Sequence, residues 1–458
     1  MELSRLSRSL YRATQVSIGS EFSISLADYT TYRPPRELGH TTRTIDFFTA
    51  ICRFRNLALR TRSITAHVLA EETNTRHHVL PYGCESAIET IPFSSPQARR
   101  RITEVLDNHR RHTSLLLILL LCRNLTTLSI KAEISLSFIQ ELSSVVVSYR
   151  PHPELRNLTV EWARERGNED SLQGYDLQDV KLLLCAQKLR SAIFVSLFQS
   201  AVMNWSPETR FLRGPKRKAG DEASTLKSWS TIRELTLQRC VLPSSWPAML
   251  SPFCLGTSLA HLEFIIPLRQ SPISPLDVHM LNLEAFSEAL NRISSTLQML
   301  KIDVDLPLIP WSTMLGAVIH AKWDFLDLLS MDRLHKLVLP WFWWTSTSGR
   351  NPQRDSEKSC VGWTLSNLRE LVLLKCEIED QDVLLLAVIN DLIARRHSQH
   401  SSRPEISPYL QRITLEASVD RQRPPKWLPA ARDLTRRGEL VGIDIELQTR
   451  ILSWADGI

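Results

Sequence analysis

Apolar residues recur along this chain in one short pattern that is repeated many times. The pattern is L-x-x-L-x-L, with other aliphatic residues or Phe in place of some leucines, and a clear copy lies within LSNLRELVLLKCEIED, residues 365 to 380. Because its fourth and sixth positions are two residues apart, the pattern predicts a short strand with one buried face. The ten copies are Leu125/Leu128/Ile130, Leu155/Leu158/Val160, Leu189/Ala192/Phe194, Ile232/Leu235/Leu237, Leu259/Leu262/Phe264, Leu297/Leu300/Ile302, Leu334/Leu337/Leu339, Leu368/Leu371/Leu373, Leu410/Ile413/Leu415 and Leu440/Ile443/Ile445, with a further copy expected near Ile64/Ala66/Val68.

The segments between the copies have room for a helix and two connections. First positions of neighbouring copies are 27 to 43 residues apart. Residues 137–150 and 285–300 carry apolar side chains three and four residues apart, which is typical of amphipathic helices. Alternating strands and helices predict an α/β fold with parallel strands and right-handed crossovers. Two architectures fit this order, a solenoid built from repeats and a large non-repeating α/β domain.

The copies resemble those of the leucine-rich repeat family, in particular its cysteine-containing subtype, L-x-x-L-x-L-x-x-C. Two copies carry the cysteine in place, at Cys240 in IRELTLQRC and at Cys376. The spacing of this chain is longer and less even than the roughly 20 to 29 residues usual for that family. The resemblance covers about residues 110–447 and implies an irregular leucine-rich-repeat solenoid, with parallel strands on a concave face and helices on a convex face.

The chain is expected to divide into a helical N-terminal cap, residues 1–60, and the solenoid, residues 61–458. Three polar stretches interrupt the apolar rhythm and predict insertion loops, at 204–228, 345–359 and 395–408. The first contains the basic cluster Lys216 to Lys218, which reads either as a nuclear localisation signal or as part of a solvated loop. A cytoplasmic or nuclear location is expected.

The N-terminal sequence LSRLSRSLYRATQVSIGSEFSI, Leu3 to Ile24, resembles the segment that follows the F-box core in fungal-type F-box/leucine-rich-repeat proteins. There a last helix of the form L-x-x-x-S-R-x-L-Y leads into an extended strand. An F-box core begins with Leu-Pro and an acidic residue, and nothing before Leu3 supplies it. Adaptor docking is therefore expected only if a box is encoded upstream of Met1. The alternative is that Leu3 to Arg12 is simply an amphipathic capping helix.

Composition narrows the remaining function classes. Apolar residues make up 43% and charged residues 23% of the chain, as in folded proteins, and the net charge of +6 comes without a long basic stripe in the sequence. Nucleic-acid binding is therefore not indicated, and the longest apolar run is too short to cross a membrane. No phosphate-binding loop, metal-ligand motif or nucleophile elbow is present, so neither a cofactor nor an enzymatic activity is expected.

The stretch LVLPWFWWTS, residues 337 to 346, is the strongest candidate for a binding surface. Strand alternation predicts that Val338, Val372 and Leu374 point to the concave face, where most other copies carry polar residues. Aromatic side chains of the kind found in binding hot spots follow directly, at Trp341, Phe342 and Trp343. The alternative is that these aromatics fill the core. Further along, the acidic positions Glu416, Asp444 and Glu446 favour a basic partner segment.

These features together predict protein–protein recognition by a solenoid. The resemblance to the F-box family implies substrate recognition for a cullin–RING ubiquitin ligase. Two alternatives stay open, an interaction scaffold without a box and an enzyme on a non-repeating α/β fold.

Overall fold

A computed structural model describes part of the chain. The described residues are 25–27, 55–68, 88–89, 91, 96–108, 113–132, 136–139, 141, 154–162, 180–184, 186–195, 231–238, 258–267, 290–291, 293–305, 331–341, 367–374, 376, 382–397, 409–419 and 428–451. The chain divides into two compact units, Met1–Val195 and Ser196–Ile458. Each unit is described by itself.

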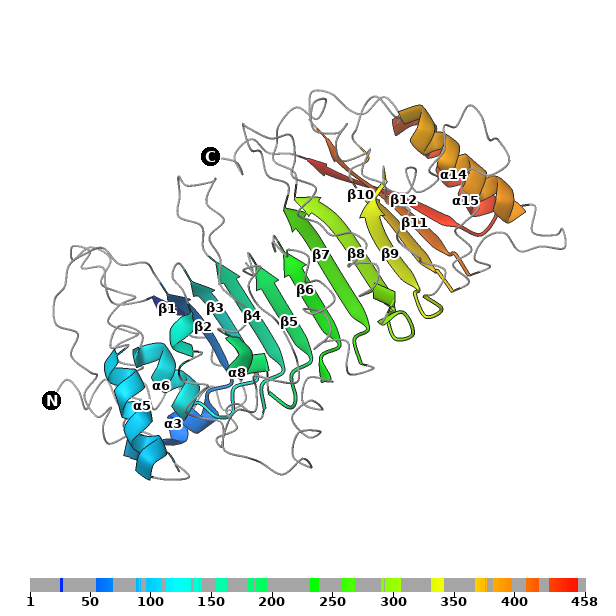
Figure 1. Ribbon diagram of the computed structural model, residues 1–458. Coiled ribbons are helices and arrows are strands. Elements are labelled where there is room, and N and C mark those ends of the chain that lie inside the picture. The colour runs from blue at the N-terminus through cyan, green and yellow to red at the C-terminus, as the bar shows by residue number, and fades with distance from the viewer. Residues whose placement is uncertain are drawn as a thin grey trace, which may run out of the picture. The chain divides into compact units, whose positions relative to one another are not determined.

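The described residues of the first unit form five parallel strands that are paired in the order of the sequence (Figure 1). The strands are β1 (Ser25–Ala27), β2 (Ser63–Val68), β3 (Thr127–Ala132), β4 (Asn157–Trp162) and β5 (Ser191–Val195). The helices are α3 (Arg55–Arg60), α5 (Pro96–Asn108), α6 (Thr113–Leu121) and α8 (Lys181–Leu184). Leucines fill α6, and those at 115, 116, 117, 119 and 120 are buried, as the apolar run predicts.

In the part of the second unit that the structure describes there are seven parallel strands, again paired in sequence order. They are β6 (Glu234–Gln238), β7 (His261–Pro267), β8 (Met299–Asp305), β9 (Lys336–Pro340), β10 (Glu370–Leu374), β11 (Arg412–Val419) and β12 (Asp444–Ile451). Two helices, α14 (Asp382–His397) and α15 (Leu428–Leu440), lie side by side near β10 to β12 (Figure 1). The predicted α/β class with parallel strands is confirmed, and the sequential strand order is consistent with a solenoid.

One backbone contact recurs between neighbouring copies of the pattern. If the first residue of L-x-x-L-x-L is position 1, the carbonyl at position 2 accepts hydrogen bonds from the N–H groups at positions 2 and 3 of the next copy. The Arg62 carbonyl, for example, accepts from Thr126 at 2.7 Å and from Thr127 at 3.0 Å. The other carbonyls that make this double contact are those of Thr126, Arg156, Arg233, Ala260, Gln298, His335 and Arg369. These eight pairs of neighbouring copies therefore meet in the same way, whereas among the described residues the Gln411 carbonyl accepts only from Asp444 of the last copy, at 2.8 Å.

Positions 1, 4 and 6 build the core, as the pattern predicts. In the first nine copies every residue at these positions is at most 4% exposed. The additional copy in β2 is confirmed, with Ile64 and Ala66 buried and in register with Leu128 and Ile130. Its first position is Thr61, a buried polar residue. At the cysteine position of the tenth strand, the buried Cys376 thiol donates to the Leu373 carbonyl at 3.2 Å, whereas Cys240 lies outside the described residues.

The residue just before position 1 closes the turn onto the previous copy. Thr296 donates its hydroxyl to the Leu259 carbonyl at 2.9 Å, and Ser258 donates to the Ile232 carbonyl at 3.1 Å. Asparagine, which is longer, reaches two residues further back, since Asn124 donates to the carbonyl of Leu59 in α3, whereas position 1 of that copy is Thr61. These bonds satisfy carbonyls that the parallel ladder leaves unpaired.

The last copy is in a different register from the one expected. The sequence placed its first position at Leu440, but that side chain is 87% exposed at the end of α15. The ladder pairs Ile413 with Ile445 and Leu415 with Leu447. Positions 4 and 6 of this copy are therefore Ile445 and Leu447, two residues further along than predicted.

The turn that ends α15 causes this shift. Gly442 has a φ of 74°, and the amide of Ile443 donates to the Gly438 carbonyl at 2.9 Å while Gly442 itself donates to the Glu439 carbonyl at 3.1 Å. This pair of bonds is a Schellman motif, which keeps Leu440 in the helix and delays the strand until Asp444. Because the shift is an even number of residues, it leaves the same set of side chains on the buried face.

The predicted N-terminal cap and insertion loops fall mostly outside the described residues. Leu3 to Arg12 and the loops at 204–228 and 345–359 are not among them. Strand β1 begins directly after the FSI sequence that was expected to be extended. Of the third loop, residues 395–397 belong to α14 and the rest lies outside the described part.

Candidate functional site

The outer face of the second unit carries a row of alternating charges. We define the outer face as strand positions 3, 5 and 7, which alternate with the buried positions 4 and 6. At position 3 of four neighbouring strands stand Lys336, Glu370, Arg412 and Asp444, and the ladder pairs each with the next in register. We call these four residues the charged row. Its signs read plus, minus, plus, minus from β9 to β12.

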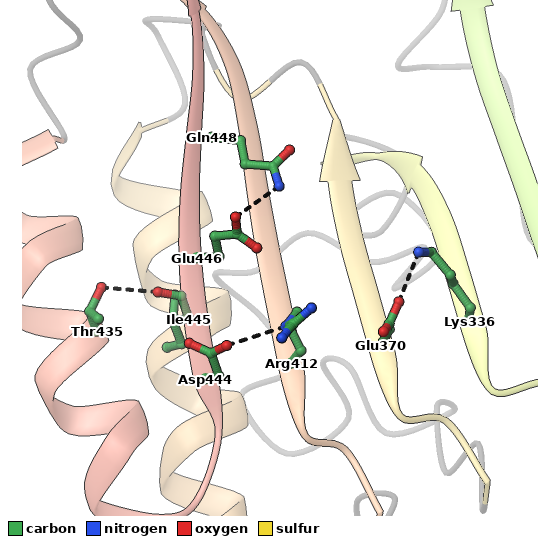
Figure 2. A network of polar contacts seen from close by, with 8 residues as sticks. All are labelled: Lys336, Glu370, Arg412, Thr435, Asp444, Ile445, Glu446 and Gln448. Carbon is green, nitrogen blue, oxygen red and sulfur yellow. Dashed lines mark hydrogen bonds and ion pairs between the residues drawn. The ribbon is translucent and has the colours of Figure 1, made fainter.

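Two ion pairs hold the charged row together (Figure 2). Lys336 Nζ lies 2.8 Å from Glu370 Oε2, and Arg412 Nε lies 3.2 Å from Asp444 Oδ2. The hydrogen bond from Lys336 lowers the pKa of Glu370 below its ordinary value, although partial burial opposes this effect. The charges of Lys336, Arg412 and His335 lower the pKa further. Glu370 therefore stays ionised at neutral pH, paired with Lys336 and in register with Arg412 on the other side.

Position 5 forms a second row with an apolar centre. At one end Lys301 Nζ bonds Glu263 Oε1 at 2.6 Å, and both side chains are only about a quarter exposed. The next strands carry Val338 and Val372, which pair with each other in register. Val372 is half-buried, but Val338 is only 5% exposed.

The expected exposure of the apolar patch is thus only partly seen. Strand alternation predicted that Val338 and Leu374 would face a partner, but they are 5% and 6% exposed. Val338 lies on a strand with neighbours on both sides and is in register with Lys301 and Val372. Of the three predicted aliphatic contacts, Val372 alone retains intermediate exposure.

Trp341 belongs to the core. This is the alternative to a binding surface that the sequence analysis left open. It directly follows β9 at position 8 of its copy, on the buried side, and is 1% exposed. Its indole Nε1 has no hydrogen-bond partner. Phe342 and Trp343, which were predicted to flank the patch, lie outside the described residues.

The acidic positions gather at the end of the second unit. Asp444 and Glu446 are exposed on β12, and Glu416 is half-buried at position 7 of β11. Asp444 is neutralised by Arg412, whereas Glu446 accepts a bond from the uncharged Gln448 at 3.0 Å. The backbone of Ile445, between the two acids, accepts a bond from Thr435 of α15, so this side of β12 faces the helix and the acids face away (Figure 2). Glu416 and Glu446 are therefore the two acids of this face that have no cationic partner within the described residues.

Sequence reasoning found the acids but missed the charged row. Its four members are separated by 32 to 42 residues in the chain, and so no local window contains two of them. The signal was present at position 3, where aligning the copies gives Lys336, Glu370, Arg412 and, after the register correction, Asp444. The row became visible once the ladder fixed which residues lie side by side.

Neither a metal-ligand cluster nor a membrane-spanning helix occurs among the described residues. Within the described ranges, no three or more His, Cys, Asp and Glu residues are grouped so that they could hold a metal ion. None of the helices in the same ranges combines the length and apolar character needed for a membrane crossing.

Comparison with known proteins gave no relative. No family model matches this chain, and no curated protein matches it.

Proposed function

We propose that this protein recognises a partner protein through the outer face of β9 to β12. The observation that carries the proposal is the distribution of charge on that face. Lys336, Glu370, Arg412 and Asp444 neutralise one another, whereas Glu416 and Glu446 have no cation beside them in the described residues. Charge left uncompensated on an ordered surface favours a partner of opposite sign.

The neighbouring residues define the kind of segment that fits. Val372 is half-buried in the same row as Glu446, with Thr414 between them, and Glu416 stands in register with Gln448. A lysine or arginine of the partner can lay its aliphatic stem over Val372 and place its charge near Glu416 and Glu446. The partner is accordingly a protein with a basic, extended segment.

The N-terminal sequence and the repeats resemble those of F-box/leucine-rich-repeat proteins. This resemblance suggests a biological role for the recognition of a partner protein. In that setting the partner is the substrate of a cullin–RING ubiquitin ligase, and an F-box encoded with the chain docks the ligase adaptor. Without a box, the same face serves an interaction scaffold.

The experiment compares partner sets of the full chain and two charge variants. Glu416→Lys/Glu446→Lys reverses the uncompensated acids, and Asp433→Lys/Glu439→Lys makes the same charge change at two exposed positions of α15. Each protein is purified from its source cells and its partners are quantified by mass spectrometry. We expect at least one partner to fall tenfold in the first variant and to stay within twofold in the second.

A partner set that is the same in all three proteins, or reduced equally in both variants, contradicts the proposal. The ligase role is tested in the same samples. Co-purification of a cullin and its adaptor with the wild-type chain supports it, and their absence supports the scaffold.

A further inference from the structure

A second charged surface lies in the first unit, at the edge of the sheet where the strands begin. The residues that immediately precede β2, β4 and β5 are Arg62, Arg156 and Arg190, each at position 2 of its copy, and Thr126 precedes β3. All three arginines are exposed, as is Arg60 at the end of α3. We call these four arginines the arginine rim.

Backbone contacts fix the arginines side by side. The carbonyl of Arg62 accepts from Thr126, that of Thr126 accepts from Arg156, and that of Arg156 accepts from Arg190 at 2.8 Å. Neighbouring strands are about 4.8 Å apart, so three steps place the ends of this series roughly 14 Å apart. Figure 1 shows the starts of β3, β4 and β5 along one edge of the sheet.

The charge of this edge is strongly positive. The residues two places earlier in each copy are Arg60, Asn124, Glu154 and Lys188, and Lys188 bonds both carboxylate oxygens of Glu154, at 2.6 and 2.8 Å. The two rows together hold five cations and one anion, a net charge of +4. The only acid among these eight positions is therefore already neutralised by Lys188.

The field of the rim acts on that acid. The hydrogen bond from Lys188 lowers the pKa of Glu154 below its ordinary value, and the positive charges of Arg156 and Arg62 lower it further. Arg62 also donates to the Asn124 carbonyl at 3.1 Å, while no bond or ion pair holds the guanidinium groups of Arg60, Arg156 and Arg190 within the described residues. These three groups are available to an external anion.

Position 2 of the copies in the second unit carries fewer arginines. The position 2 residues of its first six copies are Arg233, Ala260, Gln298, His335, Arg369 and Gln411. Only two of the six are arginines, and three copies separate them. The rim is thus a property of the first unit and does not follow from the repeat itself, since the position accepts Ala, Gln or Thr equally well.

From this geometry we infer that the arginine rim binds an acidic, extended segment of a partner protein. Guanidinium groups bind carboxylates through paired N–H donors, which makes arginine the preferred residue for such contacts. An extended chain advances about 3.3 Å per residue, so four or five residues rich in Asp and Glu cover the rim. This site is additional to the outer face of β9 to β12, and its test does not require that proposal to hold.

A nucleic-acid strand fits the surface less well. Proteins that hold single strands stack the bases on exposed aromatic side chains. In the described part of the first unit the aromatic residues are Phe138, Trp162 and Phe194, and none is more than 9% exposed. Duplex binding commonly engages about 6 to 10 phosphates, which is more than the four arginines can contact.

The test uses the purified full chain and two fluorescent probes, a decamer of glutamate and a decamer of uridylate. Arg156→Glu/Arg190→Glu reverses two rim charges, and Arg432→Glu/Arg436→Glu makes the same change at exposed positions of α15. We expect oligoglutamate binding, measured by fluorescence anisotropy, to weaken at least tenfold in the first variant and less than twofold in the second. Arg156→Lys/Arg190→Lys should retain a measurable part of the affinity.

Three results would overturn the inference. If Arg156→Glu/Arg190→Glu binds oligoglutamate with wild-type affinity, the rim is not the binding site. If both charge-reversal variants weaken binding equally, the effect comes from net charge alone. Tighter binding of oligouridylate than of oligoglutamate, lost in the same variant, assigns the rim to nucleic acid. Circular dichroism melts establish that each variant is folded, and Arg156→Gln/Arg190→Gln replaces the reversal if that variant is not.

Discussion

Glu370 is held as a carboxylate by cations on the two neighbouring strands. Its pKa is lowered chiefly by the hydrogen bond from Lys336, with smaller effects from the charges of Lys336, Arg412 and His335. A lowered pKa in the folded state means that the pair stabilises the fold above the ordinary glutamate pKa of the unfolded chain. This contribution is lost as the pH falls through the folded-state pKa.

Glu370→Gln should therefore lower the free energy of unfolding at pH 7 by up to about 1 kcal/mol, because the pair is partly exposed. The difference from wild type should shrink as the pH falls below the ordinary glutamate range. Urea unfolding at a series of pH values measures it, with Glu439→Gln at an exposed site of α15 as the control. A difference that is the same at every pH would show that the carboxylate charge plays no part.

Trp341 combines deep burial with an indole N–H that has no acceptor. An unpaired buried donor costs about 1–3 kcal/mol, which offsets part of what the ring gains by packing. Trp341→Phe removes the donor and keeps most of the ring, so we expect a change in unfolding free energy of less than about 1.5 kcal/mol. Trp341→Ala should cost about 3–5 kcal/mol, because it leaves a cavity. Chemical denaturation separates the two outcomes, and equal large losses would mean that ring shape dominates.

At the scale of elements, α15 packs closely against the start of β12 at Gly438. A Cβ at Gly438 would lie 2.7 Å from the Ile443 carbonyl oxygen and 2.7 Å from Ile445 Cδ1. The backbone oxygen cannot move away without breaking the bond from Ile443 that ends the helix, since the Gly438 carbonyl accepts it at 2.9 Å. Helix and strand therefore approach closely at the turn after which β12 begins, at Asp444.

Gly438→Ala should accordingly destabilise the second unit by about 1–3 kcal/mol, the usual cost of forcing extra atoms into a packed interface. Alanine favours helices by about 1 kcal/mol over glycine, so a purely local effect would have the opposite sign. Gly442→Asn is the matched control, since nothing lies within 4 Å of a Cβ there and asparagine tolerates the positive φ of 74°. A stabilised Gly438→Ala variant in thermal unfolding would contradict the packing argument.

At the scale of the whole molecule, the chain comprises two compact units. Units with separate cores can unfold separately, so one unfolding transition is not guaranteed for the chain. Leu128 and Leu371 occupy the same position 4 in the two units, and both are 0% exposed. Each is therefore a buried residue of its own unit.

Leu128→Ala and Leu371→Ala should each cost about 2–5 kcal/mol, but in different transitions. We expect differential scanning calorimetry of the full chain to show two transitions, with Leu128→Ala lowering one midpoint and Leu371→Ala lowering the other. If both substitutions displace a single shared transition, the units fold as one cooperative body.

The sequence by itself determined the strands, their parallel direction and the residues of their buried faces. Positions 1, 4 and 6 were identified correctly in nine copies because burial of alternate side chains leaves a period of two in any strand. The pattern failed only at the last copy, where Leu440 matched it by chance. The Val-Gly sequence after α15 was the available clue, since glycine commonly ends a helix.

The tertiary structure alone decided which residues are neighbours across the strands. The charged row joins residues 32 to 42 positions apart, and the arginine rim joins Arg62, Arg156 and Arg190, which are 94 and 34 positions apart. Neither set is therefore visible as a cluster in the sequence. Strand alternation also could not predict that Val338 and Leu374 are buried. Alternation assigns a side chain to one face of the sheet, but it does not say how exposed that side chain is. The charge pairing between strands and the exposure of a side chain both depend on the side chains of adjacent strands. Which side chains are adjacent is fixed only when the ladder sets the register.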